Sequence, residues 1–138
     1  RLSELYAEFD RVIPVLRGST ADRLCSIFAI HYEFETRRVK LFLAHIAASY
    51  NPSNDPEVAP FGRNPRLTQM LLDVLRDGVQ RGEVREDLDL LLIADTLKAA
   101  YAWNYRMAAA AGGRLPAAQM SSVMDKQIAL IAEGWKPR

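Results

Sequence analysis

The chain has 138 residues, of which 49% are hydrophobic and 25% charged, a composition typical of one soluble globular domain. Its formal net charge of +1 gives no electrostatic argument for binding nucleic acid, because domains that hold phosphates are usually far more basic. The single cysteine, Cys25, excludes an internal disulfide and fits a reducing compartment, so a cytoplasmic location is expected. No apolar run reaches the roughly 20 residues that span a bilayer, so no membrane association is expected.

The first part of the chain predicts two amphipathic helices joined by a short corner. The first covers about Leu2–Ile13, with apolar residues recurring on one stripe. Pro14 must end or kink it, because proline cannot donate the backbone hydrogen bond that a helix interior needs. Ser19 or Thr20 is expected to cap the second helix, with Asp22 close to a capping-box position.

The second helical pattern persists to about Ala48, which is long for one helix of a globular domain. The segment Asn51–Asn64 contains three prolines and a glycine and is therefore expected to be a loop. Pro65 suits the first turn of the helix that follows, and Asn64 can cap it. That helix should end at Gly82, where a left-handed residue is favoured.

Two further helices complete the predicted all-α chain. Asp87 or Asp89 can cap a helix that is apolar around most of its circumference, with a narrow polar strip of Asp95, Lys98 and Arg106. A corner at Ala111–Pro116 leads to the last helix, whose apolar residues recur regularly from Met120 to Trp135. A helix as apolar as the first of these must be covered on more than one side.

The corner Gln80–Asp87, with the sequence QRGEVRED, is followed by Leu88, Asp89 and an Ala/Leu-rich helix. It resembles the corner between the seventh and eighth helices of TetR-type transcriptional regulators, and Asp22–Leu24 is similar to the opening of their fifth helix. The resemblance implies that residues 1–138 form one ligand-binding and dimerisation domain, a helical bundle with helices four to nine of that family. It also implies a break in the second helix near Glu35–Arg38, and an N-terminal helix-turn-helix that this chain does not contain.

The function that the resemblance implies is effector sensing and dimerisation within such a regulator. A small, mostly apolar molecule would displace the first helix and so change DNA binding, which would occur only through the absent N-terminal domain. The alternative is a free-standing helical bundle that carries a ligand or scaffolds a partner. A longer native reading frame with a helix-turn-helix would distinguish the two.

A ligand site is expected where polar side chains interrupt an apolar helix. His31 and Glu35 lie one turn apart and can orient a ligand within an apolar cavity. The alternative is a partly buried histidine with a carboxylate partner among ordinary core aromatics. The candidate ligand-binding residues are Phe28, His31, Glu35, Phe42, Tyr101 and Trp103.

Neither a metal site nor catalysis is expected. On one helix His31 and His45 would stand roughly 21 Å apart along the axis, whereas zinc ligands lie about 2 Å from one ion. The chain has no G-x-S-x-G, phosphate-loop or HExxH motif, and Cys25 has no activating neighbour in the sequence. No enzyme and no cofactor are therefore predicted.

A homodimer is expected through the last two helices. The first offers a strip of small residues along which another helix could approach, and the second offers an apolar stripe suited to a four-helix arrangement about a two-fold axis. The candidate interface residues are Ala94, Ala100, Ala108, Met120, Val123, Met124, Ile128 and Ile131.

Overall fold

Every regular element in the part of the chain that the structure describes is helical. The structure is a computed structural model that describes residues 2–38, 65–110 and 116–138. The all-α class is therefore confirmed. The loop expected at Asn51–Asn64, the helical pattern from Val39 to Ala48 and most of the corner at Ala111–Pro116 lie outside the described residues.

The N-terminal helix α1 (Leu2–Val12) buries one face of its amphipathic pattern. Leu5 and Phe9, which lie one turn apart, are completely buried. After α1 the chain forms the 3-10 helix η1 (Ile13–Val15), which contains Pro14, so the helix ends where the proline requires it to end.

The second helix, α2 (Thr20–Glu35), has a complete capping box at its start. The side chain of Ser19 accepts a hydrogen bond from the backbone of Asp22, and the carboxylate of Asp22 accepts one from the backbone of Ser19. At its other end α2 passes into the 3-10 helix η2 (Thr36–Arg38). The break expected near Glu35–Arg38 is therefore confirmed.

Two antiparallel neighbours follow, α4 (Pro65–Gln80) and α5 (Leu90–Ala110). Gly82 lies in the left-handed region, with φ of 77°, as expected of the residue that ends α4. Of the two candidate caps for α5, Asp89 performs the role, since its carboxylate accepts a hydrogen bond from the backbone of Leu92 at 3.1 Å.

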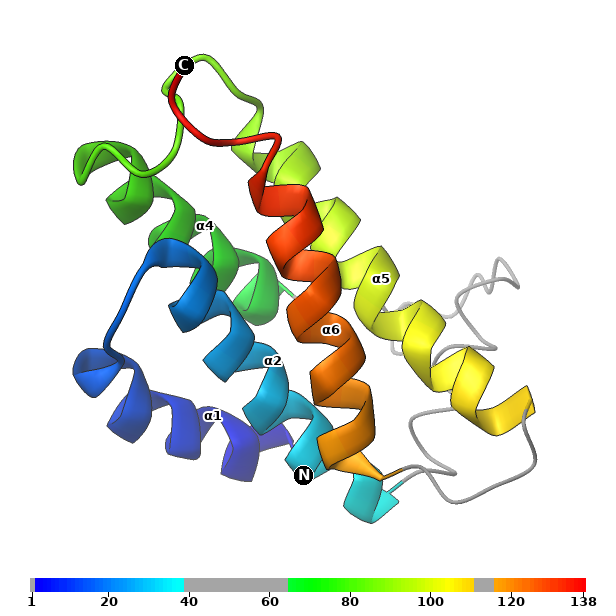
Figure 1. Cartoon of the computed structure of the whole chain (residues 1–138). Helices are drawn as coiled ribbons and strands as arrows, with labels where there is room; N and C mark the ends of the chain where they lie inside the picture. Colours follow the sequence, from blue (N-terminus) through cyan, green and yellow to red (C-terminus); the bar gives the residue numbers. More distant parts are fainter. Residues whose placement is uncertain (1, 39–64, 111–115) are drawn as a thin grey trace, which may run out of the picture.

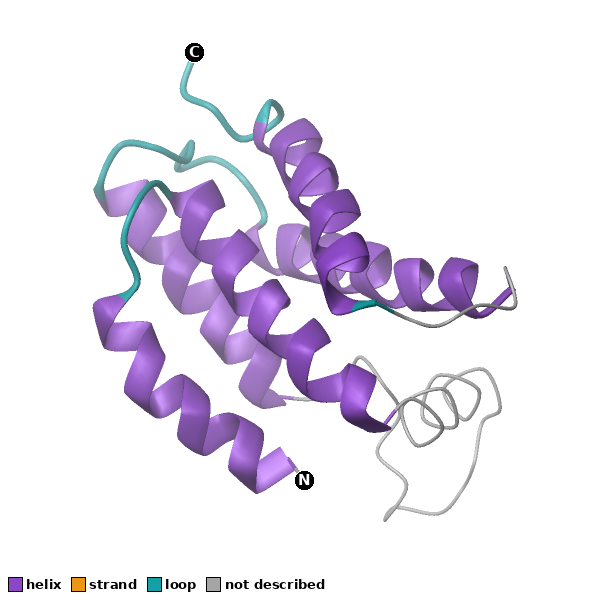
Figure 2. Ribbon diagram, turned by 60° about the horizontal axis from the view of Figure 1, so that its bottom comes forward, coloured by secondary structure: helices purple, strands orange, loops and turns teal. Residues whose placement is uncertain are grey.

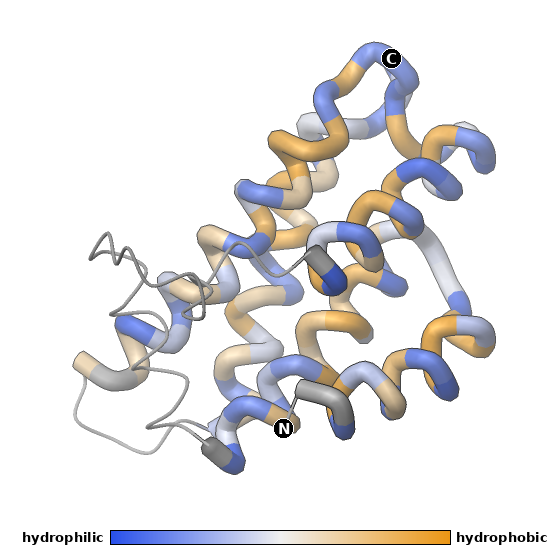
Figure 3. The backbone as a smooth tube through the Cα atoms, turned by 180° about the vertical axis from the view of Figure 1, so that it is seen from behind, coloured by the Kyte–Doolittle hydropathy of each residue, from blue (hydrophilic) through white to orange (hydrophobic). Residues whose placement is uncertain are grey.

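The last helix, α6 (Ala117–Ala132), packs against both α2 and α5. In Figure 1, α2 lies in the middle of the molecule, with α1 on one side and α6 on the other, and α5 runs along the far side of α6. Figure 2 shows α1 running beside α2. Hydrophobic and hydrophilic residues alternate around the turns of the helices, as Figure 3 shows. One core therefore collects the apolar faces of all these helices.

The polar strip expected on α5 is only partly a surface feature. Lys98 has 5% of its surface exposed, and its ammonium lies 2.8 Å from the hydroxyl of Thr68 on α4 and 3.2 Å from the carboxylate of Asp95. Asp95 and Arg106 of this strip are exposed, whereas the alkyl stem of Lys98 is buried and its charged end reaches polar partners. Within residues 2–38, 65–110 and 116–138, no helix is long and apolar enough to cross a membrane.

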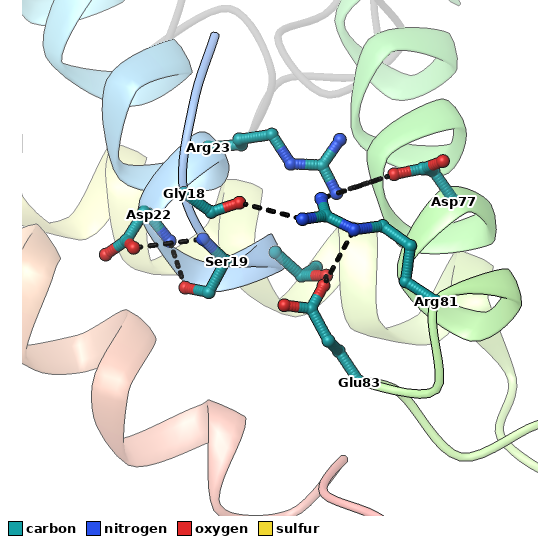
Figure 4. Close-up of polar contacts among 8 residues, drawn as sticks. Gly18, Ser19, Asp22, Arg23, Asp77, Arg81 and Glu83 are labelled. Atoms are coloured by element: carbon teal, nitrogen blue, oxygen red, sulfur yellow. Dashed lines mark hydrogen bonds and ion pairs between the residues drawn. The ribbon is translucent and has the colours of Figure 1, made fainter.

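The corner after α4 is tied to the start of α2 by a polar network (Figure 4). Arg81 forms ion pairs at 3.6 Å with both Asp77 and Glu83, and the hydroxyl of Thr20 donates a hydrogen bond to Glu83 at 2.8 Å. Arg23 of α2 forms a further ion pair with Asp77 at 2.8 Å. The QRGEVRED corner thus has a structural role, because it joins two helices that are distant in the sequence.

Gly78 permits the close approach of α2 to this corner. A Cβ atom at this position would lie 2.5 Å from Oγ1 of Thr20 and 2.8 Å from Cγ2 of Val84. We expect Gly78→Ala to lower the free energy of unfolding by about 1–3 kcal/mol, the usual cost of overpacking. Urea unfolding followed by circular dichroism measures this loss. The control Gly82→Asn should cost less, because Gly82 has open space around it and Asn tolerates the left-handed region; equal losses would contradict the proposed crowding.

Candidate functional site

Aromatic side chains from three helices meet in the core between α1, α2 and α5. The ring of His31 lies with its centroid 5.0 Å from that of Phe9 and 5.8 Å from that of Tyr101. Phe28 lies 5.4 Å from Tyr101. We call the group the aromatic cluster; its members, all buried, are Phe9, Phe28, His31, Tyr32, Tyr101 and Tyr105.

His31 is the polar centre of this cluster. Only 3% of its surface is exposed, and within the part of the chain that the structure describes its Nε2 atom has no hydrogen-bond partner. Burial lowers the pKa of His31 to about 3, so the imidazole is neutral at physiological pH. A buried nitrogen in this state is able to bind a partner supplied from outside the chain.

Tyr101 lies beside this imidazole, and Tyr105 follows it one turn later on α5. Their ring centroids are 5.4 Å apart, and the two rings meet edge to face. Burial, followed by the charges of Tyr105 and Glu35, raises the pKa of Tyr101 well above its usual value. Burial also raises the pKa of Tyr105. The two phenols therefore stay neutral and keep their hydrogen-bonding protons.

A buried hydrogen-bonded ladder connects the cluster to α6. The hydroxyl of Tyr32 donates to the backbone carbonyl of Tyr101 at 3.0 Å, and the amide of Asn104 donates to that hydroxyl at 3.1 Å. Asn104 and Gln127 of α6 exchange two hydrogen bonds, at 2.7 and 3.1 Å. This ladder therefore joins α2, α5 and α6 through buried hydrogen bonds.

Four of the sequence-derived ligand residues lie in or beside the cluster. Phe28, His31 and Tyr101 are members of it, and the charge of Glu35 acts on Tyr101 and Tyr105. Trp103 does not belong to the aromatic cluster. Half of its surface (51%) is exposed, and its ring centroid lies 5.9 Å from the guanidinium of Arg106. Phe42 lies outside the described residues.

Phe9, Tyr32 and Tyr105 belong to the cluster but were not identified from the sequence as site residues. Phe9 was placed only on the apolar stripe of the first helix. The sequence could have identified Tyr105 as a site residue, because Tyr105 lies one turn after Tyr101 and so shares its helix face.

The residues expected at a dimer interface divide into three groups. Four of them fill the core of their own chain, namely Ala94, Met120, Met124 and Ile128. Ala100, Ala108 and Ile131 are partly buried against that core, whereas Val123 is exposed. Other large apolar side chains are exposed on the same two helices: Leu91, Leu92, Trp103 and Met107 on α5, and Leu130 on α6.

A surface groove of about 610 Å³ lies between α1 and the C-terminal part of α2. Ala29 and three larger apolar residues contribute the apolar lining, and the charged lining consists of three carboxylates and one guanidinium: Leu5, Ile30 and Phe34, and Glu4, Glu8, Glu33 and Arg37. Leu5 lies one turn before Phe9, so the groove reaches close to the aromatic cluster.

The low pKa of His31 predicts a particular loss of stability in mild acid. The unfolded chain binds a proton at His31 below about pH 6.5, whereas the folded chain does not until about pH 3. Stability is therefore retained above pH 6.5 and falls as the pH decreases toward 3, by about 1.4 kcal/mol per pH unit for this one group. Urea unfolding between pH 7 and 5 should show a smaller loss for His31→Leu than for the native chain; equal slopes would contradict a buried neutral imidazole.

Comparison with known proteins identifies the fold. A scan against models of protein families finds no match, and a search of curated proteins finds no significant relative. Among solved structures, the chain is similar to the ketosteroid transcriptional regulator KstR2 of Mycobacterium tuberculosis, a TetR-type regulator, with a TM-score of 0.71 and 21% sequence identity. The likeness covers 97% of this chain and 66% of the length of that one. The fold is therefore that of a TetR-type regulatory domain, as the sequence resemblance implied.

Proposed function

We propose that this chain is the effector-sensing and dimerisation domain of a TetR-type transcriptional regulator. The similarity of fold to KstR2 supports the class. The observation that carries the sensing function is His31, a buried imidazole whose Nε2 atom has no partner within the described ranges and whose ring lies beside that of the buried Tyr101. Buried polar atoms in an ordinary core are satisfied by the protein itself. A buried polar atom that lacks a hydrogen bond within the protein and lies among aromatic rings is typical of a site where a ligand supplies that hydrogen bond.

The effector that suits this site is a mostly apolar small molecule with one polar group. Phe28 and Tyr101 offer ring surfaces to its body, and Nε2 of His31 offers a hydrogen bond to its polar group. An apolar effector also agrees with the description of KstR2 as a ketosteroid regulator. Because Phe9 belongs to α1, a molecule that takes its place against His31 would move α1, the helix that leads toward the DNA-binding domain in this class.

We propose that the domain forms a homodimer through an exposed apolar face of α5 and α6. On α5, Leu92, Trp103 and Met107 are spaced so that they share one side of the helix; on α6, Val123 and Leu130 are two turns apart. Leu92 is 62% exposed and Leu130 is 76% exposed. We call these five residues the α5/α6 face. Large apolar side chains grouped in this way mark an interaction surface, and a two-fold dimer would cover both copies.

The regulator function requires a DNA-binding segment encoded with this domain. The native reading frame should contain about 50 residues before Arg1 that form a helix-turn-helix. The longer protein should shift DNA from the region flanking its own gene in a gel assay at physiological salt. The 138-residue chain alone should not, because its charge is nearly balanced. Sequence-dependent DNA binding by the 138-residue chain alone would contradict this assignment.

The second candidate function is a helical bundle that carries an apolar ligand or scaffolds a partner without DNA. The aromatic cluster fits a carrier as well as a sensor, so ligand binding alone does not separate the two. A native reading frame without a helix-turn-helix would favour the carrier.

A further inference from the structure

The unsatisfied nitrogen of His31 limits the chemistry of the molecule that binds beside it. A buried polar atom without a partner normally lowers stability, so its place in the core needs a reason. Its ring is held on both sides, by Phe9 at 5.0 Å and Tyr101 at 5.8 Å, so its orientation is determined by packing. A ligand atom that meets Nε2 would therefore meet a fixed hydrogen-bonding direction.

The electrostatic surroundings disfavour an anionic ligand. The imidazole is neutral, because burial lowers the pKa of His31 to about 3. The charge of Glu35 acts on the neighbouring phenols of Tyr101 and Tyr105 and raises the pKa of both. A carboxylate placed beside His31 would lose its hydration, meet no positive charge on the imidazole and be repelled by Glu35.

We propose that the effector presents an alcohol hydroxyl on an apolar body and that this hydroxyl hydrogen-bonds to Nε2 of His31. This inference rests on the proposed sensing function and specifies the ligand class. A neutral imidazole has one donor nitrogen and one acceptor nitrogen, and a hydroxyl is able to serve as either partner. Its second hydrogen bond would be made with the phenol of Tyr101, whose ring centroid lies 5.8 Å from that of His31.

The groove between α1 and α2 provides a route for the apolar body. Its volume of about 610 Å³ is within the usual range for sites of small organic ligands. Leu5, which lines the groove, and Phe9, which covers His31, lie one turn apart on the same face of α1. A molecule that enters along Leu5 and displaces Phe9 would reach Nε2 of His31.

The first test compares two buried polar residues by thermal unfolding of the protein without ligand. His31→Leu should raise the melting temperature by about 3 °C or more, because it removes an unsatisfied polar atom and adds apolar volume. The matched variant Asn104→Leu should lower it, because the partners Tyr32 and Gln127 would lose their hydrogen bonds. If His31→Leu also lowers the melting temperature, Nε2 is already satisfied and the proposal is overturned.

The second test compares 1-decanol with decanoate, which share an apolar body and differ in charge. The protein should bind 1-decanol, and His31→Leu should weaken that binding about tenfold, the effect of losing one hydrogen bond in a dry site. Decanoate should bind at least tenfold more weakly than 1-decanol.

Nitrogen-15 NMR gives an independent readout, since the chain has only two histidines and His45→Gln assigns their signals. The Nε2 signal of His31 should be that of a neutral imidazole at pH 5 and should move when 1-decanol is added.

Each other outcome of the second test overturns the alcohol assignment. Tighter binding of decanoate that depends on His31 would show an anionic effector and would leave the sensing function intact. Equal binding of 1-decanol by the native chain and His31→Leu would place the molecule elsewhere. Absence of binding by both probes would also reject the alcohol class, whereas the sensing function would still be judged by DNA binding of the longer protein.

Discussion

The double variant Trp103→Glu/Leu130→Glu is expected to convert the proposed homodimer into monomers. Both side chains are exposed in the single chain, so the substitutions leave its core unchanged. In a dimer that uses the α5/α6 face, they would bring four carboxylates into one interface. Each carboxylate would cost several kcal/mol if it lost its hydration without a partner, on the order of the whole stability of many dimers. Size-exclusion chromatography with light scattering measures the change directly.

The control for this experiment is Val15→Glu. Val15 is another exposed apolar residue, but it belongs to η1, after α1, and not to the α5/α6 face. The native chain and Val15→Glu should therefore both have a mass near twice 15.5 kDa. A native chain that remains monomeric at micromolar concentration would reject the dimer, and dissociation by Val15→Glu alone would place the interface elsewhere.

Tyr101→Ala is expected to cause the largest loss of stability of a single substitution in the aromatic cluster. Tyr101 is completely buried, and its ring contacts those of Phe28, His31, Tyr32 and Tyr105. Removing a buried aromatic side chain typically costs about 3–5 kcal/mol, because the surrounding core cannot close the cavity. Urea unfolding followed by circular dichroism measures the loss.

The matched variant Tyr101→Phe separates the structural role of the ring from the role of its hydroxyl. The ring stays in place, so the loss should not exceed about 1 kcal/mol, the value of one hydrogen bond. Binding of 1-decanol should still weaken, because the phenol proposed to hydrogen-bond to the alcohol would be absent. Unchanged binding by Tyr101→Phe would show that this hydroxyl does not contact the ligand. A loss of less than 1 kcal/mol in Tyr101→Ala would contradict the tight packing of the cluster.

Helix boundaries could be predicted from the sequence wherever a local rule decides them. Pro14 ends the first helix, and Ser19 with Asp22 forms a capping box within four residues. Gly82 takes the left-handed conformation after α4, and Asp89 caps α5. Each of these features depends on neighbours in the sequence, so single residues carry the information.

The orientation of α5 could not be predicted, because apolar residues surround most of it. Periodicity fails when both faces of a helix are apolar. Trp103 was therefore expected at the ligand site and is exposed, whereas Tyr105, two residues later, is buried in the cluster. The same ambiguity placed Ala94 at an interface, although it lies in the core of its own chain. Only the packing against α4 and α6 decides which face is inside.

Only some of the polar residues of the site could be identified from the sequence, because the others are brought together by tertiary packing. His31 and Glu35 were identified because they lie one turn apart on one helix, a relation that the sequence displays. The ladder of Tyr32, Asn104 and Gln127 joins three helices, and its members lie 23 or more residues apart along the chain. Contacts of this kind follow from tertiary packing and leave no local signal.

Hydrogen exchange of the protein with and without saturating 1-decanol tests the sensing function most directly. A sensor predicts opposite changes: slower exchange in α2 and α5, which hold His31 and Tyr101, and faster exchange in α1, where Phe9 loses its place against the imidazole. The ion pair of Asp10 with Arg66, at 2.6 Å, should open together with α1. Slower exchange in every helix, including α1, would show a passive carrier and would contradict the proposal that the ligand acts by moving α1.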